Sequence, residues 1–245
     1  MKALLVGYGR MGRAIEAVLV QRGHGVTGRF RRGEICLEGK EGKEVAAESC
    51  DLAFEFTAPD SARALVSLFL SKKIPVLSGT TGWDVASAVR FAREQNVPFL
   101  HSSNFSLGVA ALRRAVAAAA TALAAFPEFE PGIAERHHSK KKDAPSGTAK
   151  ALASTLEEAS GHAGVPIASL RQGGVPGEHF VFFEGEDETL ELVHRARSRA
   201  IFAQGAVRAA EWMLSSGRKG PLTFDEFFTA TTEANALLGR GRRTP

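Results

Sequence analysis

The sequence predicts an α/β protein in which a Rossmann-type parallel-sheet domain is joined to an α+β domain with an open mixed sheet. Two observations predict this fold. Up to Asn104, short apolar runs alternate with segments of helical periodicity, which is typical of a parallel sheet with right-handed crossovers. Beyond Asn104, two segments of alternating polarity follow a long helical stretch, which indicates antiparallel pairing.

The elements of the first domain follow from periodicity. The apolar run Lys2–Val6, bounded by Gly7, is typical of a buried parallel strand. Apolar residues at helical spacing predict a helix over Gly12–Gln21, which ends before Gly23. By the same criteria we expect strands at Val26–Phe30, Leu52–Phe56, Ile74–Leu77 and Val97–Leu100, and helices at Ser61–Leu70 and Asp84–Glu94.

The second domain begins with a long helix and contains a hairpin. Glu178–Glu184 and Thr189–Ala196 alternate in polarity, and the turn-like Gly185–Glu188 joins them. We expect helices at Val109–Phe126 and Thr148–Ala159, a strand at Phe129–His137, a polar loop at Ser139–Ser146, and a last helix near Gln204–Leu214. The expected domains are therefore residues 1–106 with 200–245, for a dinucleotide, and residues 107–199, for substrate and assembly.

Composition and charge exclude several classes of protein. The net charge of +4 and the pI of about 9.3 suit anionic small molecules, and without a long Lys/Arg stripe we expect no nucleic-acid partner. No apolar stretch is long enough for a membrane helix, so no membrane partner is expected. The only cysteines, Cys36 and Cys50, form no CxxC pair, which favours a reduced cytoplasmic setting.

A glycine-rich motif follows the first strand. Gly7, Gly9 and Gly12 form GxGxxG between a strand and a helix, the context in which this motif binds a dinucleotide. The glycines allow a tight turn, close approach of the pyrophosphate, and packing of helix on strand, while the helix N-terminus attracts phosphate. A structural turn without a ligand is the alternative.

The end of the second predicted strand bears on the choice of cofactor. NAD-selective sites place an acidic residue there, but this chain has Arg31 and Arg32, with no acid before Glu34. Because guanidinium groups can bind a 2′-phosphate, we expect NADPH to be preferred over NADH, with Arg31 the first candidate. Both arginines could instead be solvated surface residues.

Small polar residues end three successive predicted strands. These segments are Phe56–Pro59, Ser78–Gly82 and Ser102–Ser106. Because ligands bind at the carboxyl ends of strands in such sheets, the three turns are expected to line a nicotinamide pocket. Each segment alone is equally compatible with a plain turn.

The segment Glu135–Ala149 concentrates most of the ionisable residues that could carry chemistry. It contains His137, His138 and three lysines, and then Ser146-Gly147-Thr148 opens a helix. Backbone amides and hydroxyls at a helix N-terminus favour a carboxylate, and lysine and histidine supply charge and a proton. A metal site and a solvated lysine loop are the alternatives; adjacent histidines without further ligands at suitable spacing are poor for zinc, so no metal is expected.

At this segment the chain resembles the dihydrodipicolinate reductase family, also called 4-hydroxy-tetrahydrodipicolinate reductase. The family pattern Glu-x-His-His-x-x-Lys-x-Asp-x-Pro-Ser-Gly-Thr-Ala is matched at every fixed position of Glu135–Ala149. The GxGRMGR start, the FTxP turn, GTTG, NFS and the run Phe202–Arg208 are also similar. The resemblance thus spans the chain in order. The departures are the extra Lys140 and Lys142 and the missing acid after the second strand.

The resemblance implies an activity and roles for residues. The family reduces the dihydrodipicolinate formed from 4-hydroxy-tetrahydrodipicolinate to tetrahydrodipicolinate, in diaminopimelate and lysine biosynthesis. It implies that Lys141 donates the proton, with His137 beside it in an acid/base or polarising role. It further implies that the dicarboxylate is bound by His138, Lys141, Ser146, Gly147, Thr148 and Thr81, and the cofactor by Gly7, Arg10, Met11, Arg13, Phe56, Gly79, Thr81, Ser103 and Phe105.

The resemblance also implies a homotetramer assembled through the second domain's sheet, and hinge closure that excludes water. Two rival functions stay open at this point. A semialdehyde dehydrogenase would usually need a catalytic cysteine, and neither cysteine lies at a predicted strand end. A nucleotide-sensing protein without activity would not need His137, His138 and Lys141. The arginine-rich tail Arg240–Arg243 is expected to be a frayed surface terminus.

Overall fold

The computed structural model describes residues 1–31, 33–35 and 50–240, and side chains as far as residue 234. Arg32, Cys36 and the end of the arginine-rich tail therefore lie outside the described residues. The chain forms two compact units. Unit 1 comprises Met1–Phe105 and Phe202–Pro245, and unit 2 comprises Ser106–Ile201. The helices described here include none that is both long and apolar enough to cross a membrane.

Unit 1 contains a six-stranded sheet in the order β10-β5-β4-β3-β1-β2. Every neighbouring pair is parallel. The strands are β1 (Lys2–Val6), β2 (Gly25–Phe30), β3 (Leu52–Glu55), β4 (Val76–Ser78), β5 (Phe99–His101) and β10 (Pro221–Thr223). Because all run the same way, the segments that follow their carboxyl ends meet at one edge of the sheet.

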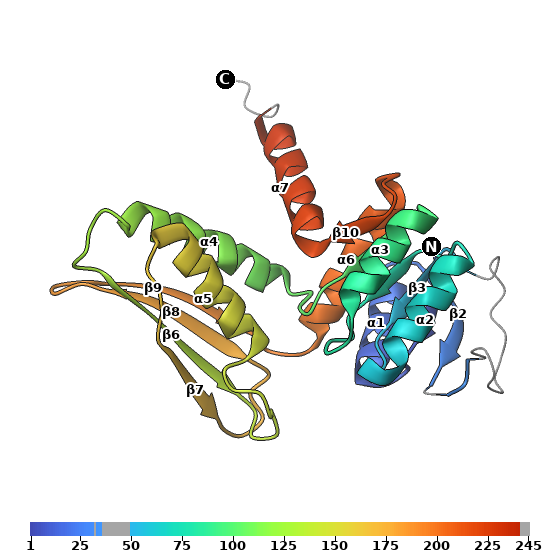
Figure 1. Ribbon diagram of the computed structural model, residues 1–245, viewed down its shortest axis with the longest axis horizontal. Coiled ribbons are helices and arrows are strands. Elements are labelled where there is room, and N and C mark those ends of the chain that lie inside the picture. The colour runs from blue at the N-terminus through green and yellow to red at the C-terminus, as the bar shows by residue number, and fades with distance from the viewer. Residues whose placement is uncertain (32, 36–49, 241–245) are drawn as a thin grey trace. The chain divides into compact units, whose positions relative to one another are not determined.

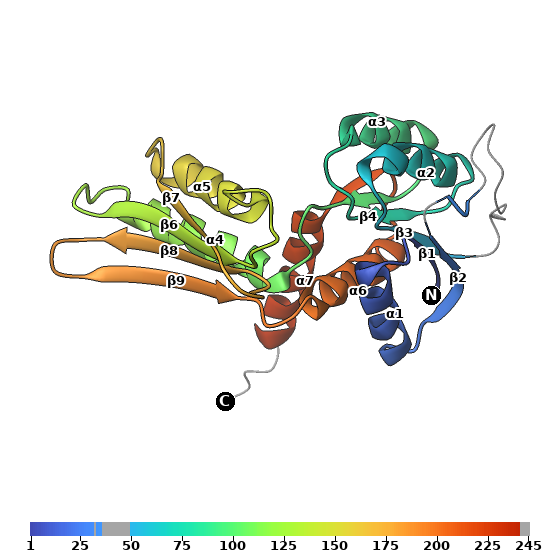
Figure 2. The same ribbon diagram turned by 90° about the horizontal axis from the view of Figure 1, so that it is seen from below.

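Helices cover both faces of this sheet (Figure 2), which makes unit 1 a Rossmann-like layer structure. α2 (Pro59–Ser71) and α3 (Val85–Gln95) lie on one face, and α1 (Arg10–Gln21) and α6 (Ala200–Ser215) on the other. The central strands are buried on both sides, as the continuous apolar runs predict: Leu4, Phe54 and Phe99 are each at most 2% exposed. The edge strand β2 alternates between exposed and half-buried residues. The predicted parallel sheet is confirmed.

Unit 2 contains a four-stranded mixed sheet in the order β7-β6-β8-β9. Its strands are β6 (Glu130–His137), β7 (Ile167–Arg171), β8 (Glu178–Glu184) and β9 (Thr189–Arg195). The predicted hairpin is present, with Glu184 opposite Thr189, and β6 pairs parallel to β7 and antiparallel to β8. α4 (Leu107–Leu123) and α5 (Gly147–Ser160) pack on one face of the sheet (Figure 1).

Three elements were not predicted from the sequence. β7 and β10 have five and three residues, which is too short for a periodic pattern, and each pairs along one edge only. The third is α7 (Phe224–Arg240), whose threonines are poor helix formers. Phe224 and Phe227 at its start pack against Phe105 and Trp212, and this burial outweighs the weak propensity.

We predict that Gly205→Ala destabilises the protein. A Cβ atom at Gly205 would lie 1.7 Å from the carbonyl oxygen of Phe105, so helix α6 would have to move. Overpacking of this kind costs about 1–3 kcal/mol. Urea unfolding should therefore show a lower midpoint for Gly205→Ala. Gly25→Ala, which meets nothing within 4 Å, is the matched control; equal midpoints for the two variants would contradict the packing argument.

Candidate active site

The glycine turn between β1 and α1 is fixed by backbone contacts. Gly7 has φ +94°, and a Cβ there would lie 2.1 Å from the carbonyl oxygen of Phe56. A Cβ at Gly12 would lie 2.7 Å from the carbonyl oxygen of Gly7. The turn is held to β2, since the N–H groups of Gly7 and Tyr8 both donate to the carbonyl of Phe30 at 2.9 Å. Gly7 and Gly12 are therefore required by the turn itself.

Gly9 differs, because a Cβ there would meet nothing within 4 Å. It is the N-cap of α1, it offers no side-chain hydrogen bond, and the first turn of α1 has no acidic residue. The helix therefore presents unpaired N–H groups and a partial positive charge, the arrangement that binds phosphate. Arg10 and Arg13 are exposed beside it, Met11 is half-buried, and the Arg13 guanidinium lies 5.8 Å from the Tyr8 ring centroid.

The end of β2 holds exposed arginine. Arg29 donates to Glu16, which also accepts a hydrogen bond from the Tyr8 hydroxyl, so Arg29 is engaged. The side chain of Arg31 is exposed, and its backbone N–H donates to Glu34 Oε2 at 2.8 Å. The Glu34 carboxylate thus accepts a hydrogen bond from the backbone of the same turn. The second expected arginine, Arg32, lies outside the described residues.

Glu55, which sequence reasoning missed, lies beneath the turns that follow β3 and β4. Its side chain is fully buried. Its Oε1 accepts from the Thr57 hydroxyl at 2.5 Å, the Thr57 N–H at 2.9 Å and the Thr80 hydroxyl at 2.7 Å. Its Oε2 accepts from the Ser78 hydroxyl at 2.5 Å. One acidic residue within the apolar run Leu52–Phe56 was the signal available in the sequence.

The three polar turns place their residues differently. A Cβ at Gly79 would lie 2.1 Å from the Phe56 ring, so this glycine lets the ring lie against the turn. Thr81 and Ser103 are exposed at the carboxyl edge of the sheet. Phe105 is only 2% exposed and packs against Phe56 at 5.9 Å between ring centroids. The structure therefore places Phe105 in the core, behind the turns.

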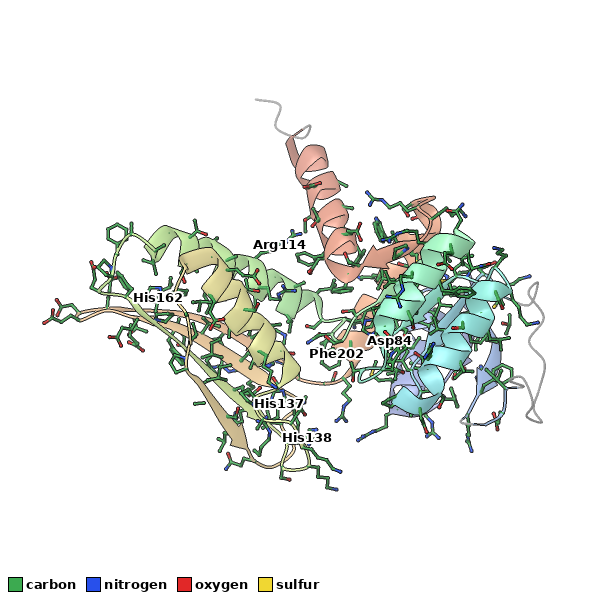
Figure 3. All side chains as sticks on the ribbon, viewed as in Figure 1. Asp84, Arg114, His137, His138, His162 and Phe202 are labelled. Atoms are coloured by element: carbon green, nitrogen blue, oxygen red, sulfur yellow. The ribbon has the colours of Figure 1, made fainter. Side chains whose placement is uncertain are left out.

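In unit 2 the predicted catalytic segment joins the end of β6 to the start of α5 (Figure 3). Glu135, two residues before His137, has a fully buried side chain. Its Oε1 accepts from the Ser146 N–H at 2.9 Å, the Ser169 hydroxyl at 2.8 Å and Arg171 Nη2 at 2.7 Å. Burial alone would raise the pKa of Glu135, but these hydrogen bonds lower it to about 2. The carboxylate is therefore ionised at neutral pH.

Three buried or half-buried histidines lie in a row on the inner face of the sheet. The His137 and His179 ring centroids are 5.2 Å apart, and those of His179 and His194 are 6.1 Å apart. His194 Nε2 lies 3.4 Å from the Ser106 hydroxyl. Burial lowers the pKa of His137 and of His194, and it lowers the pKa of His179 to about 4. The imidazoles are therefore held neutral.

Cationic side chains surround the loop between β6 and α5. Lys141 Nζ donates to Asp143 Oδ1 and Oδ2 at 2.8 and 3.0 Å, and this hydrogen bond lowers the pKa of Asp143. Arg171 Nη2 donates to the Asp143 carbonyl at 2.5 Å. Arg199 Nη2 lies 3.4 Å from His138 Nε2. Sequence reasoning missed Arg171 and Arg199, because neither stands near the catalytic segment in the chain.

At the helix start that was expected to bind a carboxylate, Ser146 forms hydrogen bonds within the protein. Ser146 is 2% exposed, its hydroxyl accepts from the Ala149 N–H at 3.1 Å, and its N–H donates to Glu135. It is the N-cap of α5, whose first turn holds no acidic residue. Gly147 is exposed and Thr148 is half-buried at the first positions of the helix. The outward-facing part of this anion site is therefore at Gly147 and Thr148.

One group among the described residues could hold a metal ion. Possible ligand atoms of Glu135, His137 and His179 all lie within 4.8 Å of one another. The Arg171 guanidinium, 2.7 Å from Glu135 Oε1, already balances the carboxylate charge. Lys141 adds further positive charge, which lowers the pKa of His137 after the larger effect of burial. These positive charges disfavour a metal cation at the cluster.

Comparisons with known proteins assign both parts of the chain to one family. The family model for the dihydrodipicolinate reductase N-terminus matches residues 1–105, and the model for its C-terminus matches residues 108–228. A 4-hydroxy-tetrahydrodipicolinate reductase from Natronomonas pharaonis is 36% identical over 236 residues, covering 87% of this chain and 94% of the relative. One from Methylocella silvestris is 37% identical over 251 residues, covering 87% and 91%.

A solved structure shares the fold. Dipicolinate-bound dihydrodipicolinate reductase from Paenisporosarcina sp. TG-14 superposes with a TM-score of 0.69 at 21% identity, covering 91% of this chain and 97% of that one. The family models together span almost the whole chain, and the predicted resemblance is confirmed. The chain therefore belongs to the dihydrodipicolinate reductase family, and it is a pyridine-nucleotide-dependent oxidoreductase of diaminopimelate and lysine biosynthesis.

Proposed function

We propose that this protein reduces the dihydrodipicolinate formed from 4-hydroxy-tetrahydrodipicolinate to tetrahydrodipicolinate, with Lys141 as the proton donor. Family membership supports the reaction. The observation that carries the residue assignment is the position of Lys141 in a cationic loop between His137 and the N-terminus of α5. Bound NAD(P)H supplies the hydride. The chain must hold a dianion and deliver one proton to the neighbouring ring carbon.

Substrate binding is assigned to the positive groups around that loop. Gly147 and Thr148 lie at the N-terminus of α5, where the helix dipole favours a carboxylate. Arg199 and His138 lie side by side and add a second cationic point. Ser146 supports this site indirectly, because it is the N-cap that holds the start of α5 in place. In unit 1, exposed Thr81 is the candidate for a further carboxylate contact.

Proton delivery is assigned to Lys141. Asp143 holds its ammonium group through two hydrogen bonds, which orients Nζ. His137 lies buried at the end of β6, with a pKa lowered mainly by burial, so it serves as a neutral polarising group. A positioned acid of this kind contributes about 10²–10⁴-fold to a rate.

Cofactor binding is assigned to the carboxyl edge of the sheet in unit 1. The uncapped start of α1 suits the pyrophosphate, and the exposed Arg31 suits a 2′-phosphate, so NADPH is the preferred cofactor over NADH. Phe105 supports the turn from the core. The full set proposed to lie along the cofactor is Gly7, Gly9, Arg10, Met11, Gly12, Arg13, Arg31, Phe56, Gly79, Thr81, Ser103 and Phe105.

The protein is further proposed to be a cytoplasmic homotetramer that binds neither nucleic acid nor membrane. The sheet of unit 2 supports assembly, because α4 and α5 cover its inner face only. On the outer face the Phe180 and Phe182 rings stack with centroids 6.3 Å apart, and Leu170 is 51% exposed. Apolar side chains gathered on an open sheet face are typical of a protein–protein contact.

Lys141→Met should lower kcat by about 10²-fold or more while NADPH still binds, because the variant loses the proton donor but keeps unit 1 intact. The measurement is substrate-dependent loss of NADPH absorbance, with dihydrodipicolinate supplied by the preceding synthase from pyruvate and aspartate semialdehyde. Lys142→Met, at the exposed neighbouring lysine, is the matched control. Near-normal turnover of Lys141→Met would show that Lys141 is not the proton donor. A wild-type protein that binds NADPH but reduces no substrate would instead favour a nucleotide sensor.

Arg31→Glu should raise the KM for NADPH about tenfold to a hundredfold and leave the KM for NADH nearly unchanged. The reason is the loss of a charge-assisted contact worth about 1.5–3 kcal/mol with the 2′-phosphate. Arg90→Glu, at an exposed arginine of α3, controls for the change in net charge. Equal Michaelis constants for the two cofactors before and after the substitution would refute the preference.

Replacing both Phe180 and Phe182 with glutamate should dissociate the tetramer. Burying two carboxylates in an apolar contact is unfavourable, so light scattering after size exclusion should report a smaller species. Phe126→Glu is the matched control, since Phe126 is 50% exposed but lies outside the sheet. A wild-type monomer, or a tetramer that survives the double substitution, would contradict the assignment of this face.

A further inference from the structure

The Glu135 side chain meets three strands and a helix start inside unit 2. It projects from β6, while its neighbours come from β7, β8 and the residue that caps α5. Its two oxygens have different surroundings. One accepts three hydrogen bonds, and the other faces two imidazole rings. The oxygen that accepts three hydrogen bonds can hold the fold together, and the oxygen that faces the imidazole rings can act on the reaction.

Oε1 organises the substrate side of the unit. Its three donors are a backbone N–H, a hydroxyl and a guanidinium, from Ser146, Ser169 and Arg171. The first fixes where α5 begins, and the last brings a cation to the Asp143 carbonyl as well. A neutral amide oxygen in the same place could accept the first two bonds. Of the three partners of Oε1, only Arg171 therefore requires the negative charge of Glu135.

Oε2 faces His137 Nδ1 at 3.3 Å and His179 Nε2 at 4.0 Å. Among the described residues none of these three buried atoms has a hydrogen-bond partner. An anionic oxygen can only accept, so it favours a proton on each facing nitrogen. For neutral His137 this selects the Nδ1–H tautomer and leaves the lone pair on Nε2.

Space for that ring is provided by a glycine. A Cβ at Gly177 would lie 2.9 Å from His137 Nε2, and Gly177 has φ +156°, which other residues rarely adopt. His137 therefore lies between the Glu135 carboxylate on its Nδ1 side and a bare backbone on its Nε2 side. The ring has little freedom to turn, so the side facing Glu135 determines which nitrogen carries the proton.

We propose that Glu135 is a positioning residue for the reaction: Oε1 holds the start of α5 and Oε2 fixes the tautomer of His137. The inference rests on the function proposed above for His137 and α5. Glu135 touches neither substrate nor cofactor in this assignment and acts through His137 and Ser146. His179 Nε2 faces the same Oε2 atom, and the neutral His179 ring packs against the His137 ring.

Glu135→Gln tests this directly, because it keeps the size and removes the charge. The amide oxygen must take the Oε1 position, where three donors converge, and the amide NH₂ must then face His137 and His179. A donor in that place selects the opposite tautomer, with the proton of His137 on Nε2. ¹⁵N chemical shifts of labelled histidines, with His137→Gln used for assignment, report the tautomer without any turnover.

We expect Glu135→Gln to switch the His137 tautomer and to lower kcat by up to about 10⁴-fold, the scale seen when a catalytic histidine is held in the wrong tautomer. The Kd for dipicolinate, used as the dicarboxylate probe, should change by less than about threefold, since α5 still has its acceptor. Glu135→Asp should restore part of kcat. Ser169→Ala, which removes one donor from Oε1 and leaves Oε2 alone, should behave like the wild-type protein.

Three results would overturn the proposal. One is a wild-type His137 with its proton on Nε2, which needs no variant to fold. Another is unchanged kcat in a Glu135→Gln protein whose tautomer has switched. The third is a loss of kcat matched by an equal loss of dipicolinate binding, which would indicate damage to α5 alone. Absence of reductase activity in the wild-type protein would refute the proposed function instead, while the tautomer measurement would still decide the position of the proton.

Discussion

In each unit, the loops that carry the candidate site residues depend on hydrogen bonds accepted by a buried glutamate in the last residues of a strand. In unit 1, Glu55 binds the Thr57 and Ser78–Thr80 turns from below. In unit 2, Glu135 binds the cap of α5 and a guanidinium. A buried carboxyl group is stable only where donors reach it, so the loops must adopt the conformations that supply those donors. The loops thereby acquire the rigidity that a binding surface requires.

Glycines in these loops and in the neighbouring elements allow backbone atoms and aromatic or imidazole rings to approach closely. Gly7, Gly12 and Gly79 each occupy a place where a Cβ would lie within 2.7 Å of a neighbouring atom. Gly177 and Gly108 leave room for the His137 and His194 rings in the same way. The glycines of unit 1 permit turns at the carboxyl edge of the sheet, and those of unit 2 permit a row of buried imidazoles. In both cases the missing side chain matters more than chain flexibility.

Two helix N-termini are candidate anion sites of different character. The start of α1 has a glycine cap and bare amides, which suits a phosphate group that approaches the backbone. The start of α5 has a serine cap held by Glu135, and lysine and arginine side chains lie near the loop that precedes it. A dicarboxylate needs such added cations, because its charge is spread over two separated groups. The proposed assignment of the cofactor to α1 and of the substrate to α5 rests on this difference.

The sequence by itself determined the alternation of strands and helices in unit 1, the hairpin of unit 2, and the motifs at Gly7–Gly12 and Glu135–Ala149. These features are local, since periodicity, glycine spacing and cap residues are properties of neighbouring positions. Short β7 and β10 escaped prediction because pairing with a distant strand forms them, and α7 because distant aromatic residues stabilise its start.

Only the tertiary structure decided what surrounds the site residues. Arg171, His179 and Arg199 come from strands and connections far along the chain from His137, and pairing in the sheet of unit 2 brings the first two beside Glu135. It also decided that Ser146 and Phe105 face inward. Burial and long-range pairing are set by the whole fold, and a linear motif contains no information on which neighbours its residues will meet.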